Sequence, residues 1–288
     1  MPASSPGDSP GAFECIRGRY ETFTKQQKVI ADFILGKGLQ IAFMSCNQLA
    51  QASGTSPATV IRFTQTLGYK SYLDFADELH AVLLQGHRPM SKLKEAIDAN
   101  DDPVATLERG CYFEIESIAD LPRLQQEASL LQAVRLLSDA KRIYVTAARS
   151  AYSLAVYSGF LFKELVNAVQ HFPSGAEDAY ERLEDASTSD VLLVITFQRY
   201  ARSSYRLAQF AAERSVKIIA LTDVPTSPVS GFADVTLFAP SKAPFFSYVA
   251  PMAILDALIW GFSRERSEDI AAILEKRQQM LLEQKVFI

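Results

Sequence analysis

Short polar side chains in the amino-terminal third of the chain have the chemistry needed to contact DNA. Ser56 followed by Pro57 is a common start for a helix, and a helix from there would reach about Leu67. One face of that helix would present hydroxyls, an amide and one guanidinium, which are groups that hydrogen-bond base edges in the major groove. That face carries Ala58, Thr59, Arg62, Gln65 and Thr66. The Ser56 hydroxyl and the first-turn N–H groups would meet a DNA phosphate, because a helix N-terminus favours an anion.

The residues that would position this helix lie directly before it, in the segment CNQLAQASG at 46–54. Ser45 is a suitable N-cap for a first helix, Ala50 is small enough for close contact, and Gly54 permits the positive φ of a tight turn. The buried face of the second helix would consist of Val60, Phe63 and Leu67. This pattern predicts a helix-turn-helix, with a purely structural helical hairpin as the alternative.

The segment SCNQLAQASGTSPATVIRFTQTLGYKSYLDF resembles the helix-turn-helix of the RpiR family of bacterial transcriptional regulators. In that family a helix with Ser, Ala, Thr, Arg and Phe is followed by Leu-Gly-Tyr/Phe-Lys and an aromatic stretch. Thr55 stands where the family usually has Val. The resemblance implies a double-stranded DNA operator as partner. The DNA-binding residues that we expect are Ser45, Ser56, Pro57, Ala58, Thr59, Arg62, Thr66 and Lys70.

Beyond Lys141, short runs rich in Val and Ile alternate with longer helical stretches, after helices that we expect at 105–120 and 123–139. The runs are RIYVTAA, AVQHF, DVLLVITF, VKIIALT and VTLFA. This alternation predicts βαβ units and a parallel sheet, with ligands at the carboxyl ends of the strands. The RpiR resemblance implies a sugar-isomerase (SIS) domain here, which usually binds phosphosugars. The expected fold is an all-α helix-turn-helix domain followed by an α/β three-layer sandwich with a five-stranded parallel sheet.

The two loops that usually hold the phosphate in this family depart from its pattern. After the first strand the chain reads TAARSAYSLA, where Thr146 and Ala148 replace the usual glycines. In the later loop, TFQRYARSSYR, the usual Ser, Gly and Thr are replaced by Gln198, Arg199 and Ala201. The Arg-Ser and Arg-Tyr loops resemble a variant subgroup, and a guanidinium can bind carboxylate or phosphate in bidentate fashion. We expect a small anionic metabolite, sugar phosphate or carboxylate, at Arg149, Ser150, Thr196, Arg199, Tyr200 and Ser203.

Each arginine also has a structural alternative. Arg149 could pair with Glu177 or Asp178, and Arg199 could cap a helix or serve a subunit contact. The segment TDVPTSP at 222–228 resembles a SIS motif, for which a turn and helix N-cap is as good an interpretation as a ligand role.

A SIS-domain sugar-phosphate isomerase or binding protein is the alternative function. Isomerisation needs a base beside a carbonyl, and His171 and Glu177 are the candidates for it. A lone histidine there is more often structural, so we expect no catalytic residue, no metal ligand and no cofactor.

Composition limits the remaining choices. A net charge of -4 means that DNA binding must come from a local patch rather than from the field of the whole molecule. Cys15, Cys46 and Cys111 include no CxxC pair, which fits neither a disulfide framework nor a thiolate zinc site. The apolar run at 248–262 is too short to span a bilayer and contains Asp256.

We therefore expect a cytoplasmic regulator with a disordered tail at 1–12, a DNA-binding domain at 13–88, a linker at 89–104 and a SIS domain at 105–288. The apolar run and a closing helix from Ser267 to Leu282 offer more apolar surface than the sheet needs. This surplus predicts a homodimer or higher homo-oligomer.

Overall fold

A computed structural model describes residues 12–37, 41, 44–85, 102–125, 127–243 and 247–286. The chain divides into two compact units, Met1–Arg88 and Pro89–Ile288. The tail expected at 1–12 lies outside the described residues except for Ala12, and the linker expected at 89–104 lies outside them up to 101. Where the described residues begin, Ala12 already lies in a helix, and Asp102 is the N-cap of another.

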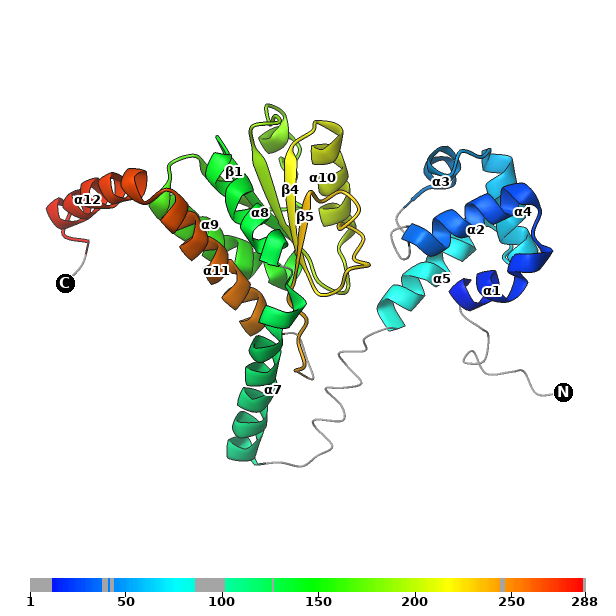
Figure 1. Ribbon diagram of the computed structural model, residues 1–288, viewed down its shortest axis with the longest axis horizontal. Coiled ribbons are helices and arrows are strands. Elements are labelled where there is room, and N and C mark those ends of the chain that lie inside the picture. The colour runs from blue at the N-terminus through cyan, green and yellow to red at the C-terminus, as the bar shows by residue number, and fades with distance from the viewer. Residues whose placement is uncertain are drawn as a thin grey trace. The chain divides into compact units, whose positions relative to one another are not determined.

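The amino-terminal unit is helical throughout its described part (Figure 1). Its elements are α1 (Ala12–Arg19), η1 (Tyr20–Thr22), α2 (Lys25–Lys37), α3 (Cys46–Ala52), α4 (Pro57–Leu67) and α5 (Tyr72–Gln85). Fully buried Ile30, Phe63 and Phe75 come from three of these helices, and Phe23 meets Phe63 edge-on with ring centroids 5.2 Å apart. This small core fixes how α4 packs against α2 and α5.

The carboxyl-terminal unit is built around a sheet of five parallel strands in the order β2-β1-β3-β4-β5. The strands are β1 (Ile143–Ala147), β2 (Val169–Pro173), β3 (Val191–Ile195), β4 (Lys217–Thr222) and β5 (Val235–Phe238). The helices are α7 (Pro103–Leu124), α8 (Glu127–Asp139), α9 (Tyr152–Leu165), α10 (Arg202–Glu213), α11 (Val249–Glu265) and α12 (Ser267–Glu283), with short turns η3 (Arg149–Ala151) and η4 (Glu181–Leu183). All five runs rich in Val and Ile form strands, which confirms the expected fold class.

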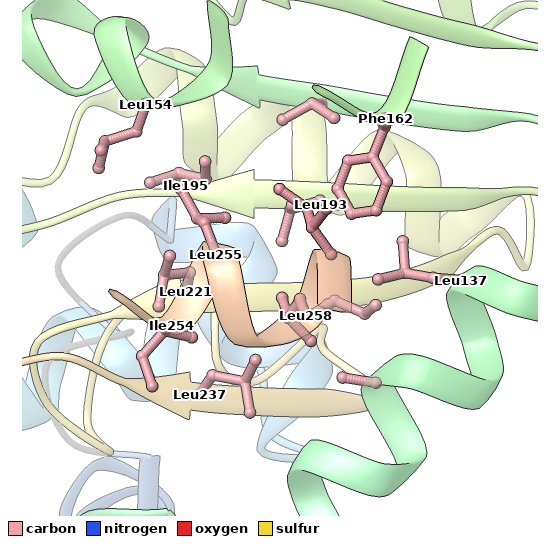
Figure 2. Packing of buried hydrophobic residues seen from close by; sticks show 14 of the residues in the cluster. Leu137, Leu154, Phe162, Leu193, Ile195, Leu221, Leu237, Ile254, Leu255 and Leu258 are labelled. Carbon is pink, nitrogen blue, oxygen red and sulfur yellow. The ribbon is translucent and has the colours of Figure 1, made fainter. Parts of the chain in front are cut away.

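Helices cover both faces of the sheet, which explains why its central strands are apolar on both sides. One face packs against α8, α9 and α11, and Figure 2 shows Leu193 and Ile195 of β3 in one cluster with Leu255 and Leu258 of α11. The other face packs against α10 and η4 through side chains such as Leu192. In Figure 1, α10 lies on the opposite side of the sheet from α8 and α11.

An ion pair joins the amino ends of the neighbouring strands β1 and β3. Arg142 precedes β1, and its guanidinium donates to both carboxylate oxygens of Asp190, at 3.1 and 2.9 Å. Asp190 precedes β3 and is only 1% exposed. Burial raises the pKa of this carboxyl, but hydrogen bonds from Arg142 and Ser187 outweigh that effect, so its pKa lies below the usual value.

The break between α7 and α8 differs from the expectation. We expected the first helix to end near 120, but α7 continues through Pro122 to Leu124. Proline in the last turn removes one donated hydrogen bond, and burial of Leu121 helps to offset that loss. The helix ends where Gln125 turns to the edge strand, donating from its amide to the Phe238 carbonyl and accepting from the Phe238 N–H at 3.0 Å.

Gly159 allows α9 to lie unusually close to β2. A Cβ at this position would lie 2.6 Å from the Cβ of His171, an atom attached directly to the strand. Neither partner can rotate away from such a contact. The approach of α9 to the sheet therefore depends on glycine.

We predict that Gly159→Ala lowers the free energy of unfolding of the protein by about 1–3 kcal/mol, because α9 must move away from β2. Gly110→Ala is the matched control: Gly110 lies inside α7 with nothing within 4 Å of a built Cβ, so alanine there should stabilise by about 0.5–1 kcal/mol. Urea unfolding of both variants measures the difference. Equal free energies of unfolding for the two variants would show that the close contact between α9 and β2 does not determine the stability of the protein.

Candidate functional site

The turn between α3 and α4 is held by local hydrogen bonds. Ser45 caps α3 in a reciprocal box with Gln48: its hydroxyl accepts from the Gln48 N–H at 3.2 Å and its own N–H donates to the Gln48 side chain at 2.8 Å. Gly54 has a φ of 66°, as the turn requires. The Ser53 hydroxyl donates to the Leu49 carbonyl at 2.7 Å. The sequence-based roles of Ala50 and Gly54 in this turn agree with the structure.

Capping residues also fix both ends of α4. The Ser56 hydroxyl accepts from the Thr59 N–H at 3.2 Å, and Pro57 occupies the first turn. At the other end Gly68 has a φ of 106°, and the N–H of Tyr69 donates to the Thr64 carbonyl at 3.1 Å. The buried face consists of Val60, Phe63, Thr64 and Leu67. Helix α4 is thus a rigid element with a defined outer face.

The outer face of α4 is exposed and chemically mixed. Six of the eight residues expected to bind DNA belong to α4 or its N-cap: Ser56, Pro57, Ala58, Thr59, Arg62 and Thr66. Of these six, Thr59 is partly buried and the others are exposed; the remaining two, Ser45 and Lys70, are exposed as well. Sequence reasoning missed Ile61, which is 41% exposed on the same side. Its apolar character resembled that of a core residue, yet a methyl-rich side chain there can meet a thymine methyl group.

Thr66 is the expected residue least free to reach a ligand. Its hydroxyl donates to the Arg62 carbonyl at 2.8 Å and accepts from the Gln27 side chain of α2 at 2.9 Å. Arg19 of α1 also donates to the Thr66 carbonyl. Thr66 therefore lies where α4 meets α1 and α2, and Ala58, Ile61, Arg62 and Gln65 make up the freer part of the face.

In the other unit a cavity of about 240 Å³ opens at the carboxyl ends of β1 and β3. It brings together four of the six residues expected to bind an effector: Arg149, Ser150, Thr196 and Arg199. Its other lining residues are Ala148, Ala151, Phe197, Gln198, Ala201 and Tyr248. The strand register explains why these residues lie together. Ala147 pairs with Ile195 in neighbouring parallel strands, so the loops that follow β1 and β3 lie side by side.

The positive charge of the cavity is not neutralised by neighbouring acids. Among the described residues neither Arg149 nor Arg199 forms an ion pair; Asp178, suggested as a partner for Arg149, instead binds Arg182 at 2.6 Å. Both guanidinium-bearing residues are exposed. Arg149 has a φ of 55°, in the left-handed region.

Two helices begin at the cavity, and neither has a side-chain cap. Ala151 precedes α9 and Ala201 precedes α10, and among the described residues no side chain caps either helix, although the N–H of Tyr152 donates to the Arg149 and Ser150 carbonyls of η3. In contrast, Ser45, Ser56 and Asp102 cap α3, α4 and α7. The positive ends of two helix dipoles thus add to the charge of the two arginines.

Tyr200 and Ser203 are not among the lining residues. The Tyr200 hydroxyl donates to Asp223 at the end of β4 at 2.6 Å, and the same carboxylate accepts from the Gln198 N–H at 3.2 Å. Burial, together with Asp223, raises the pKa of the Tyr200 hydroxyl. The hydroxyl of Ser203 lies 3.2 Å from that of Ser174. Tyr200 therefore holds the loop that carries Arg199 and does not itself face the cavity.

Comparison with known proteins gives two family matches that together span both units. The rpiR-family helix-turn-helix domain matches residues 11–85, and the SIS domain matches residues 136–260. The chain belongs to the RpiR family. It is thus a helix-turn-helix transcriptional regulator that carries a SIS domain.

Relatives with the same organisation span nearly the whole chain. An HTH-type transcriptional regulator of Caldanaerobacter subterraneus subsp. tengcongensis is 26% identical over 94% of this chain and 97% of its own length. The regulator HexR of Pseudomonas aeruginosa is 24% identical, covering 93% and 95%. Among solved structures, the sugar isomerase domain of an RpiR transcription factor from Sphaerobacter thermophilus is 22% identical, with a TM-score of 0.57, covering 59% of this chain and 97% of that one. The Vibrio vulnificus NanR protein, complexed with ManNAc-6P, is 20% identical, with a TM-score of 0.54, covering 94% and 97%.

In this RpiR chain the two candidate bases lie away from the cavity. His171 is in β2, where its ring packs on α9 at Gly159 and its Nδ1 lies 3.3 Å from the Tyr152 hydroxyl. Glu177 is exposed after β2 and does not line the cavity. Among the described residues there is also no group of three or more His, Cys, Asp or Glu that could hold a metal. No described helix has both the length and the apolarity to cross a membrane.

The cavity residues that sequence reasoning missed are mainly Phe197 and Tyr248. Tyr248 comes from the start of α11, far along the chain, and its hydroxyl lies 2.8 Å from that of Ser150. Its ring centroid lies 5.8 Å from that of Phe197. No local pattern marks Tyr248, since only the packing of α11 on the sheet brings it to the β1 loop.

Proposed function

We propose that this RpiR regulator binds a double-stranded DNA operator through α4 and that a small anionic metabolite in the SIS cavity controls the affinity. The observation that carries the proposal is the cavity itself: two arginines without ion pairs among the described residues and two uncapped helix N-termini meet in one place. Such a site stabilises negative charge through charge-assisted hydrogen bonds and helix dipoles.

For the DNA side, the outer face of α4 supports contact with base edges. Arg62 is exposed at the middle of the helix, and its guanidinium can bind guanine in bidentate fashion. Ser45, Ser56 and Lys70 are exposed near the ends of α3 and α4, where phosphate contacts would fix the orientation of the helix. Because the net charge of the chain is -4, this local face must supply the attraction.

Control by a ligand follows from linkage. A metabolite changes operator affinity only if it binds more tightly to one of two arrangements of the helix-turn-helix pair, and DNA must then change metabolite affinity by the same factor. That the Vibrio vulnificus NanR protein was solved in complex with ManNAc-6P supports an anionic effector for the present chain as well.

The alternative of a sugar-phosphate isomerase lacks a base. An aldose-ketose isomerase needs a side chain within hydrogen-bonding reach of the migrating proton. The described cavity lining contains neither a carboxylate nor a histidine. We therefore propose effector binding without catalysis, in the cytoplasm where the operator lies, with the regions 13–88 and 105–288 as the DNA-binding and effector-binding parts.

We further propose a homodimer formed through the carboxyl-terminal unit, since two-fold operators are bound by two helix-turn-helix units. Large apolar side chains are exposed on its outer helices, including Phe160 of α9 and Trp260 and Met252 of α11. Trp260 is 74% exposed, which is unusual for a tryptophan on a monomer surface.

We predict that Arg62→Ala weakens specific operator binding by about 1–3 kcal/mol for each half-site, because a bidentate base contact is lost. Arg135→Ala, which removes an exposed arginine from α8, should leave affinity unchanged. Gel-shift titration at fixed salt with a natural upstream region measures both. Unaltered affinity of the Arg62 variant would reduce Arg62 to a solvated side chain.

We predict that at least one anionic metabolite raises the Tm of the wild type but not that of Arg199→Ala. At about one hundred times its Kd, a ligand adds about 2.7 kcal/mol, or roughly 5–10 °C in a domain of this size. Arg202→Ala is the matched control, since Arg202 is exposed on α10 but does not line the cavity. Equal stabilisation of all three proteins by every active compound would remove Arg199 from the site.

We predict that Trp260→Lys dissociates the dimer, because a charge would be buried in an apolar interface. Leu107→Lys on α7, where leucine is 67% exposed, is the control for a different surface. Sedimentation of each variant at tens of micromolar gives the oligomeric state. Trp260 is the chain's one tryptophan, so its emission also reports dissociation on dilution of the wild type. A monomeric wild type contradicts the dimer, and dissociation by Leu107→Lys alone moves the interface to α7.

A further inference from the structure

The lining of the SIS cavity indicates the chemical class of its effector. We infer that this cavity binds a compact organic dianion with two separate acid groups and few hydroxyls, the class of a short dicarboxylic acid, in preference to a sugar phosphate. The inference rests on the proposed function, because it presupposes that the cavity between the β1 and β3 loops is the effector site.

The charges of the cavity come from two separate loops. Arg149 follows β1 and Arg199 follows β3, and these strands are direct neighbours, with Ala147 paired to Ile195. Neighbouring strands lie about 4.8 Å apart. Two guanidinium groups anchored on separate loops offer two bidentate sites, and each matches the geometry of one carboxylate.

Each of the two loops that carry an arginine also leads into the N-terminus of one helix. Helix α9 begins beyond the Arg149 loop, and α10 begins at Ala201, two residues beyond Arg199. Neither has a side-chain cap, so each loop combines one arginine with one positive helix end. Each half of the cavity therefore favours a negative group of its own.

The walls between these charges offer little to a polyhydroxylated ligand. Ala148, Ala151 and Ala201 contribute methyl groups, and the paired rings of Phe197 and Tyr248 add an aromatic surface. Every buried sugar hydroxyl needs a partner to offset its loss of water.

Two of the neutral polar side chains that line the cavity are already engaged with one another. The Ser150 hydroxyl already shares a hydrogen bond with that of Tyr248. Asp223, the carboxylate behind the β3 loop, accepts from the Gln198 N–H and from Tyr200, and it does not line the cavity. The other neutral polar residues of the lining are Thr196 and Gln198, which are too few for the several hydroxyls of a sugar, whereas the short apolar chain of a diacid fits the methyl and ring surfaces.

Calorimetric titration of the full chain tests this inference with four kinds of probe. These are unbranched dicarboxylates of three to six carbons, the monomethyl ester of the tightest-binding dicarboxylate, a hexose 6-phosphate and inorganic phosphate. We expect one dicarboxylate to bind most tightly. Its monoester should bind roughly ten- to a hundred-fold more weakly, because one charge-assisted contact is lost.

Variants on the two loops complete the test. Arg199→Gln and Arg149→Asn should each weaken the dicarboxylate by roughly ten-fold or more and bring the diacid and its monoester to similar affinity. Asn is chosen at 149 because it tolerates the left-handed backbone found there. Arg202→Gln, which removes a nearby charge outside the cavity, should retain wild-type affinity.

The outcomes separate this inference from the proposed function. Tighter binding of the hexose phosphate than of every dicarboxylate, lost in both loop variants, overturns the diacid and supports an anionic effector. Dicarboxylate binding that survives both loop substitutions overturns the two-arginine site. If none of the anions binds the wild type, both the diacid and the proposed effector site fail.

Discussion

The pairing of β1 with β3 is the constraint on which the proposed effector cavity depends. These strands are parallel and in register from Ile143 with Val191 to Ala147 with Ile195. The Arg142–Asp190 ion pair joins them at the amino ends, where Asp190 is buried and its carboxyl has a lowered pKa. Because β1 and β3 end at the same level in this register, the two arginine loops that follow them lie side by side.

The helix N-termini of the two units differ in whether a side chain caps them. In the helix-turn-helix, Ser45 and Ser56 satisfy first-turn N–H groups, so α3 and α4 keep their geometry without a ligand. In the SIS unit, alanines precede α9 and α10, so their side chains cannot cap these helices, and at α9 the N–H of Tyr152 donates to carbonyls of η3 instead. This difference supports our proposals of a preformed DNA-contacting face in one unit and of a site completed by an anion in the other.

Features that depend on local pattern could be predicted from the sequence. The turn at Gly54, the caps at Ser45 and Ser56 and the five apolar strands follow from φ requirements, hydrogen bonding and hydrophobicity within a few residues. The same reasoning located the β1 and β3 loops, because carboxyl ends of neighbouring parallel strands share one edge.

Features that depend on side-chain direction or distant packing could not be predicted. Tyr200 follows Arg199 directly, but its hydroxyl turns to Asp223, since a buried phenol needs a partner and β4 supplies one. Thr66 turns toward Gln27 of α2, and Tyr248 reaches the cavity only because α11 packs on the sheet. Helix α7 runs past the expected end near 120 to Leu124, with Leu121 buried and Pro122 inside the last turn.

The backbone of Arg149 has a consequence for how the ligand specificity of such a site can change. A left-handed φ of 55° costs an arginine roughly 1 kcal/mol that glycine would not incur. The backbone of the loop thus has a conformation that suits glycine, yet the residue there carries a guanidinium. The positive charge therefore comes with a loss of stability. A change of side chain alone can therefore alter which ligand class such a loop favours, without any rearrangement of the main chain, and substitution of Arg149 by glycine would restore stability as the charge is lost.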